Sequence, residues 1–299
     1  MNTLAATLSN SLIDELVLHT VGLPKSKIFH RIFTAFFGDI TDRFSQLAVS
    51  FDEITKKSGL PAASKWALAR FCRNIQIHGV ENIPDDGPLL VLSNHPGAYD
   101  ALIIFSHLNQ HRILSVSSEI PFLRYLPNTG QHFLFAPRKD SRERMIVLRH
   151  SVRHLQGGGT LTFFGSGHRD PDPSVYPGAE EAIDHWLEVI GVFFQYVEGL
   201  KVLPVIISGV VSPKWVRHPI TWLRKKQIDR QRLAEYGQVM TQIRKPSQLF
   251  MEPRISIGEP YTEDSLEEIV GSGTLHQAVI NRSKILYRES RAYFGSFYE

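Results

Sequence analysis

Short apolar runs that alternate with helical stretches constrain the fold of this chain most. From about residue 70, segments rich in branched and aromatic residues are bounded by turn residues, as expected of strands. The predicted strands are 75–80, 87–95, 112–118, 131–137, 160–167, 201–210 and 254–260, with helices between several of them. Since strands covered on both faces form nearly continuous apolar runs, the pattern predicts an α/β fold with a mostly parallel sheet covered by helices.

The first sixty residues show a helical pattern instead. Apolar side chains recur there at three- and four-residue steps, which indicates an amphipathic helix. They are Ile28, Phe29, Ile32, Phe33, Phe36, Phe37, Ile40, Phe44 and Leu47. This face either docks on the protein's own core or lies on a membrane. The sequence SGLPA at 58–62 interrupts the pattern. We therefore expect an N-terminal helical segment at 1–65, with a membrane-docking role possible, and an α/β domain at 66–299.

Composition limits the location and the partners. The 299 residues are 42% hydrophobic and 21% charged, so a packed core is expected, and a net charge of +3 is too small to imply nucleic acid. The single cysteine, Cys72, suits a reducing compartment. No run reaches the roughly 18 apolar residues that span a bilayer, and the N-terminus lacks the features of a signal peptide. We expect a cytoplasmic protein whose membrane contact, if any, is peripheral.

A basic stretch with two tryptophans follows the sixth predicted strand. Trp215 and Trp222 lie there among seven cations: Lys214, Arg217, Arg224, Lys225, Lys226, Arg230 and Arg232. Tryptophans among clustered cations fit an anionic membrane interface. The alternatives are a site for an anionic cofactor or nucleic acid, and a solvated basic helix with two packed tryptophans.

The segment SNHPGAYDAL, residues 93–102, places a histidine and a carboxylate at the end of a predicted strand. Ligands of open α/β sheets bind at the carboxyl ends of the strands, where His95 is expected. The turn at Pro96 and Gly97 can fold Asp100 back onto the imidazole, fix its tautomer and leave the other ring nitrogen as a general base. The alternative, which the pair alone favours, is a histidine hydrogen-bonded in a turn and an aspartate capping a helix.

The same segment resembles the first motif, His followed by four residues and Asp, of the glycerolipid acyltransferases, which include the lysophosphatidic acid acyltransferases. Three further blocks follow in the family's order. Arg138 stands where the arginine of the second motif belongs, residues 164–169 align with a third motif that usually reads Phe-Pro-Glu-Gly-Thr-Arg, and Pro204 lies on the fourth. The resemblance runs from about residue 75 to 212 and implies an α/β fold and acyl transfer.

The resemblance implies a mechanism without an acyl-enzyme. His95 would deprotonate a hydroxyl of a lysophospholipid or glycerol phosphate-like acceptor, which attacks the thioester of acyl-CoA or acyl carrier protein, and Asp100 would orient His95. Arg138 and Arg169 would hold an anionic head group, since guanidinium groups match phosphate oxygens. The implied substrate-binding residues are Arg138, Gly165, Ser166, Gly167, His168 and Arg169. We expect no metal and no bound cofactor.

The third motif departs from the family pattern. Ser166 replaces the usual glutamate and His168 the usual threonine, so a carboxylate that helps bind the acceptor is lost. The expected activity is that of a 1-acylglycerol-3-phosphate acyltransferase-like enzyme, peripheral on the inner face of the cell membrane. Its partners would be the lipid acceptor, the acyl thioester and an anionic membrane surface, without nucleic acid. The alternatives are a catalytically impaired lipid-binding protein and an acyl-thioester hydrolase.

Overall fold

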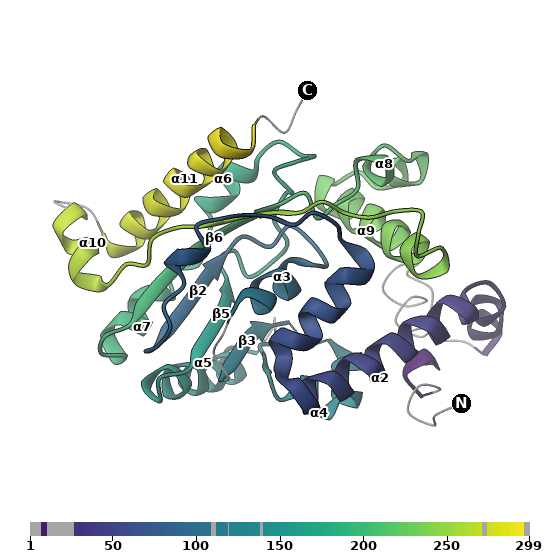
Figure 1. Ribbon diagram of the computed structural model, residues 1–299, viewed down its shortest axis with the longest axis horizontal. Coiled ribbons are helices and arrows are strands. Elements are labelled where there is room, and N and C mark those ends of the chain that lie inside the picture. The colour runs from purple at the N-terminus through teal and green to yellow at the C-terminus, as the bar shows by residue number, and fades with distance from the viewer. Residues whose placement is uncertain are drawn as a thin grey trace.

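A single seven-stranded sheet forms the centre of the computed structural model, which describes residues 7–10, 27–108, 112–118, 120–137, 140–270 and 274–295 (Figure 1). The strand order is β1-β7-β6-β2-β5-β3-β4. The strands are β1 (Gln76–His78), β2 (Leu89–Ser93), β3 (Ile113–Ser117), β4 (Phe133–Phe135), β5 (Thr160–Phe164), β6 (Lys201–Ser208) and β7 (Arg254–Ile257). Every neighbouring pair is parallel except β6 with β7. The predicted α/β fold with a mostly parallel sheet is confirmed.

Helices lie on both sides of this sheet (Figure 1). The α-helices are α2 (Lys27–Phe71), α3 (Asp100–His107), α4 (Pro127–Gly130), α5 (Ser141–Gln156), α6 (Ala179–Ile183), α7 (Ile190–Tyr196), α8 (Pro213–Val216), α9 (Gln227–Arg244), α10 (Glu263–Val270) and α11 (Leu275–Phe294). The described residues also form three short 3-10 helices, η2 (Val80–Asn82), η3 (Pro121–Tyr125) and η4 (Pro219–Leu223). Helices α2, α3 and α9 contribute to the apolar core on one face, and α5, α6, α7 and α11 to the core on the other.

The alternation of side chains along β2 explains how one strand serves both cores. Leu89 and Val91 join the cluster beneath α2 and α3, whereas Leu90 and Leu92 join the cluster beneath α7 and α11. Successive side chains of a strand point to opposite faces, so both sets must be apolar when both faces are covered. All five residues of β2 are buried, which fixes this central strand and the position of the residues that follow it.

Helix α2 runs across residue 65, where the sequence predicts a domain boundary, and its regular geometry is interrupted earlier, at Gly59 (φ 84°, ψ 167°). Part of the predicted apolar face docks on the protein: Ile40 is buried, and the ring of Phe44 packs edge-on against Phe122 at 5.7 Å. Phe36, by contrast, is 76% exposed. The side chains of Phe29 and Phe33 lie outside the described residues. The division into two domains stays a prediction.

The two tryptophans of the basic stretch have different environments. Trp215 is half-buried and packs against α9 so closely that a Cβ at Gly237 would lie 2.3 Å from its ring. Trp222, at the end of η4, is 68% exposed and is followed by the exposed residues 223–226. In the described ranges, no helix combines the length and apolar character needed to cross a bilayer.

Candidate active site

The site is built at the carboxyl end of β2, between β5 and β6. The amide of Asn94 donates to the carbonyl of Ile207 on β6, and its oxygen accepts from the same residue's N–H, both at 2.8 Å. These two hydrogen bonds extend the pairing of β2 with β6 by one residue beyond the end of β2. His95 therefore leaves the sheet at a fixed position, rather than from a mobile loop.

The structure brings His95 and Asp100 together. The chain turns at Pro96 and Gly97, and Asp100 begins α3 with its side chain almost completely buried. Its Oδ2 lies 2.7 Å from Nδ1 of His95 and accepts the N–H of Gly97 at 3.0 Å, while Oδ1 accepts the N–H of Ala101 at 2.6 Å. The carboxylate of Asp100 thus hydrogen bonds both to the backbone of the turn and to the ring of His95. A proton held on Nδ1 leaves Nε2 with a free lone pair, as a general base requires.

Two further contacts hold His95 in place. Its ring stacks on Phe164, the last residue of β5, with centroids 4.4 Å apart, and 27% of the side chain stays exposed. Its backbone forms a reciprocal pair with Asp170: the His95 N–H donates to Oδ2 at 2.8 Å, and the Asp170 N–H donates to the His95 carbonyl at 2.8 Å. The imidazole is therefore oriented from the ring and from the main chain.

The glycines of the third motif are explained by packing and by turn geometry. A Cβ on Gly165 would lie 2.2 Å from the indole of Trp186, and Gly167 has a φ of +65°. The hydroxyl of Ser166 is buried and donates to the carbonyl of His168 at 2.6 Å, so it stabilises its own loop. His168 is exposed. A role of these four residues in binding substrate stays a prediction.

Arg169 lies in the site, but in an ion pair. Its guanidinium contacts the carboxylate of Glu235 on α9, and both side chains are largely buried. Burial lowers the pKa of Arg169, an effect that the nearby carboxylate of Asp100 opposes. The second predicted guanidinium, Arg138, lies outside the described residues.

Sequence reasoning missed the residues that connect the third motif to the rest of the site. The fully buried carboxylate of Asp172 accepts the N–H groups of Gly209, Val210 and Val211, each at 2.9 Å. It thereby ties the loop after β5 to the end of β6. Asp170 is likewise buried, and burial raises the pKa of its carboxyl group. Asp170 directly follows the third motif and Asp172 lies two residues further along, and this proximity to the motif was the available signal.

Helix α9 contributes a buried polar stripe that was also missed. Gln231, Glu235, Gln238 and Gln242 recur at steps of four, three and four residues, and all four are buried. That spacing places them on one face of the helix. The cations of this stretch stand out in the sequence, whereas the buried face of α9 is neutral and acidic.

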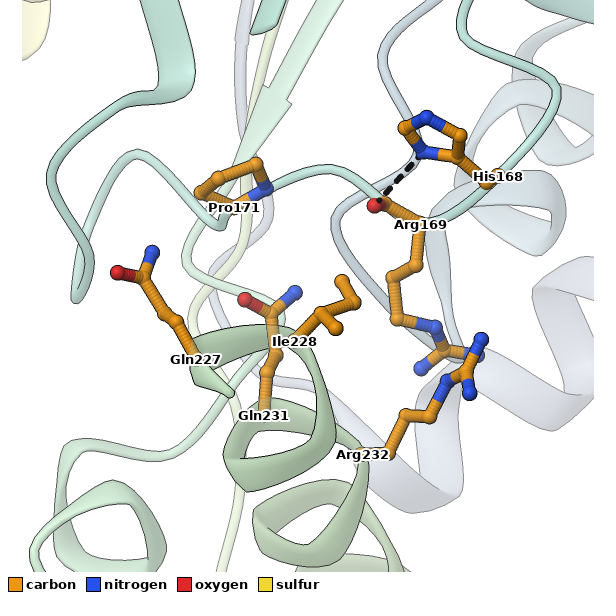
Figure 2. Close-up of a pocket in the computed structure, with 7 residues that line it drawn as sticks. All are labelled: His168, Arg169, Pro171, Gln227, Ile228, Gln231 and Arg232. Atoms are coloured by element: carbon orange, nitrogen blue, oxygen red, sulfur yellow. Dashed lines mark hydrogen bonds between the residues drawn. The ribbon is translucent and has the colours of Figure 1, made fainter. Parts of the chain in front are cut away.

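A pocket of about 380 Å³ opens where α9 meets the third-motif loop (Figure 2). The residues lining it are His168, Arg169, Pro171, Gln227, Ile228, Gln231 and Arg232. In Figure 2 the side chains of Arg169 and Arg232 lie beside each other on one side of the pocket. Two of the seven residues that line this pocket, Arg169 and Arg232, carry a guanidinium group.

The described residues provide no alternative nucleophile at His95. No hydroxyl or thiol among them hydrogen bonds to its ring, and Asp100 is its polar side-chain partner. Burial raises the pKa of the Cys72 thiol to about 12, so this cysteine is protonated at neutral pH. Within the same residues, no group of three or more His, Cys, Asp and Glu side chains could hold a metal ion.

The chain resembles known proteins at the level of a family model and of solved structures. No curated protein matches the chain. Among solved structures, the chain is similar to the 1-acyl-sn-glycerophosphate (LPA) acyltransferase PlsC from Thermotoga maritima, with 16% identity, a TM-score of 0.43, and coverage of 100% of this chain and 98% of that one. Residues 74–208 match the sequence model of the Acyltransferase family, a range that holds His95, Asp100 and Arg169. The family resemblance predicted from the sequence is thus confirmed for residues 74–208, which match the Acyltransferase family model.

Proposed function

We propose that this protein transfers an acyl group from acyl-CoA or acyl carrier protein to a hydroxyl of a lysophospholipid or glycerol phosphate-like acceptor. The observation that carries the proposal is the 2.7 Å contact between His95 and Asp100 inside the acyltransferase domain. The pocket with two arginines supports an anionic acceptor.

The proposed reaction is a direct displacement between two bound substrates. Nε2 of His95 takes the proton of the acceptor hydroxyl as its oxygen attacks the thioester carbonyl carbon. Asp100 stabilises the imidazolium that forms. The C–S bond of the tetrahedral intermediate then breaks, and the thiolate leaves with the proton from His95. The products are an ester and a free thiol, and holding both reactants together supplies much of the rate enhancement.

Product analysis tests this proposal directly. The purified full-length chain is incubated with a radiolabelled acyl thioester, with and without lysophosphatidic acid, lysophosphatidylcholine and glycerol 3-phosphate. Acceptor-dependent formation of a labelled ester supports acyl transfer. Release of free fatty acid at equal rates with and without acceptor would indicate a thioester hydrolase, and lipid binding without turnover would indicate an inactive family member.

Replacing Arg169 with alanine is expected to raise the KM for a phosphate-bearing acceptor more than the KM for the thioester. The reason is that a guanidinium at the pocket binds phosphate oxygens by charge-assisted hydrogen bonds. Steady-state kinetics with each substrate varied in turn measure the two effects separately.

The ion pair with Glu235 requires a control for folding. Removing one partner of a buried pair typically destabilises a protein by about 3–5 kcal/mol, because a buried charge is left behind. The double variant Arg169→Ala/Glu235→Ala removes both charges, so it leaves no unpaired buried charge and is the control for this destabilisation. If charged and uncharged acceptors have equal KM values, both in the wild type and in a folded variant, Arg169 does not recognise the acceptor phosphate.

Binding to anionic vesicles is expected through exposed apolar residues next to cations. Trp222 and Leu223 are exposed at the end of η4 and are followed by Arg224, Lys225 and Lys226. Each cation near an anionic surface contributes about 1 kcal/mol, and the contribution weakens with salt. We expect cosedimentation with phosphatidylglycerol vesicles that falls at high ionic strength and in Trp222→Ser/Leu223→Ser.

Matched variants separate the two predicted docking surfaces. Phe36→Ser tests the N-terminal helix. Tyr196→Ser, which removes an exposed aromatic residue of α7 outside both surfaces, is the control. Circular dichroism of each variant is the check that it is folded. If the wild type stays in the supernatant with anionic vesicles at low salt, peripheral membrane binding is wrong and a soluble acceptor becomes the better candidate.

A further inference from the structure

Helix α9 begins after the acyltransferase match ends, yet it is attached directly to the site. The amide nitrogen of Gln231 donates to the carbonyls of Pro96 at 2.5 Å and Asp170 at 2.8 Å. Its amide oxygen accepts the N–H of Asp172 at 3.3 Å. One buried side chain therefore joins α9 to the turn that carries His95 and to the loop that carries Arg169. The residues of α9 that line the pocket are held at a fixed position relative to the proposed base.

The charge of Arg169 is compensated within the protein. Its guanidinium pairs with Glu235, and the carboxylate of Asp100 also stabilises its charge. The Glu235 carboxylate is buried, so its negative charge is poorly screened by water at this position. Arg169 therefore supplies hydrogen-bond donors to the pocket, but little net positive charge.

Arg232 differs from Arg169 in its pairing. It lies in the second turn of α9, and its nearest described acidic partner is Asp229 at 3.8 Å. The two side chains are 41% and 40% exposed, so water screens this long contact strongly. In Figure 2 the Arg232 guanidinium lies beside that of Arg169, and, besides burial, the charge of Arg232 contributes to lowering the pKa of Arg169, so both charges act on the same side of the pocket.

We propose that Arg232 determines the head-group specificity of the acceptor, by giving the pocket a positive charge that selects a phosphate monoester over a zwitterionic phosphodiester. This inference rests on the proposed acyl transfer to a lipid acceptor. A phosphate monoester carries between one and two negative charges at neutral pH, whereas a phosphocholine head group is neutral overall. Arg169 with Glu235 supplies oriented donors, and Arg232 supplies the charge that distinguishes the two head groups.

A binding experiment tests the charge without requiring turnover. The full chain is titrated with sn-glycerol 3-phosphate by isothermal titration calorimetry, using the wild type, Arg232→Gln and Arg244→Gln. Arg244 is an exposed cation in the last turn of α9 and does not line the pocket, so both variants lose one charge from the same helix. We expect a roughly tenfold higher Kd for Arg232→Gln, as for the loss of one charge-assisted hydrogen bond, and an unchanged Kd for Arg244→Gln. Equal Kd values for Arg232→Gln and the wild type, or equal weakening in both variants, would overturn the assignment.

Kinetics then distinguish an acceptor phosphate from the phosphates of coenzyme A. Acceptor selectivity is the ratio of kcat/KM for lysophosphatidic acid to that for lysophosphatidylcholine, measured with acyl-CoA and with acyl-pantetheine, which lacks phosphate. The proposal expects Arg232→Gln to lower this ratio about tenfold with both donors. A rise confined to the KM for acyl-CoA would assign Arg232 to the donor and overturn it. Absence of transfer to any acceptor would refute the proposed function, whereas the calorimetric result would still decide whether Arg232 binds phosphate.

Discussion

Replacing His95 with alanine is expected to reduce acyl transfer by about 10² to 10⁴-fold, the usual contribution of a positioned general base. Nε2 is the nitrogen left available when Nδ1 is bound to Asp100, and no other described group takes its place at the ring. Turnover is measured as thiol release with saturating acceptor and thioester. The fold should be retained, because the side chain lies at the end of a strand and is partly exposed.

Two companion variants make this result interpretable. In His95→Asn the amide can donate to Asp100 in place of Nδ1, but the variant has no basic nitrogen in place of Nε2. It should be as inactive as His95→Ala while leaving the buried carboxylate paired. His150→Ala removes an exposed histidine of α5 and should have normal activity. Near-normal turnover in a folded His95→Asn variant would show that His95 is not the base.

The sheet could be predicted from the sequence because its strands are local signals. A run such as Leu89–Ser93 is apolar at every position up to its last residue, which indicates a strand covered on both faces. The contact between His95 and Asp100 was also predictable, since both residues belong to one short segment with Pro96 and Gly97 between them. Each of these features depends on neighbouring residues in the chain.

Contacts between distant segments could not be predicted in the same way. The ion pair of Arg169 with Glu235 joins the loop after β5 to α9. The two residues are far apart in the sequence, and their spacing does not indicate that they pair. The same holds for Trp215, whose partner Gly237 lies on the next long helix. Counting cations identified the basic stretch, but it did not separate Trp215, which packs on α9, from the exposed Trp222.

Replacing Asp100 with asparagine is expected to lower the rate by up to about 10⁴-fold, the size of the tautomer effect in other carboxylate–histidine pairs. Oδ2 of Asp100 accepts from the Gly97 N–H and contacts Nδ1 of His95. An asparagine that keeps its oxygen toward Ala101 turns its amide nitrogen, a donor, toward the ring. His95 would then place its proton on Nε2, where it blocks the proposed base.

A capping aspartate of another helix, Asp140, provides a control for the alternative that Asp100 only stabilises its turn and helix. Asp140 caps α5 by accepting the N–H groups of Arg142 and Glu143, and none of its described hydrogen bonds reaches His95 or Asp100. Since asparagine caps helices about as well as aspartate, Asp140→Asn should retain activity and stability. If Asp100 acts only on its turn and helix, Asp100→Asn should be equally harmless. Nitrogen-15 NMR of the His95 ring provides a second measurement, because a shift of the proton from Nδ1 to Nε2 is expected in Asp100→Asn. Loss of activity with an unchanged tautomer would contradict this explanation and leave the stabilisation of the imidazolium as the main role of Asp100.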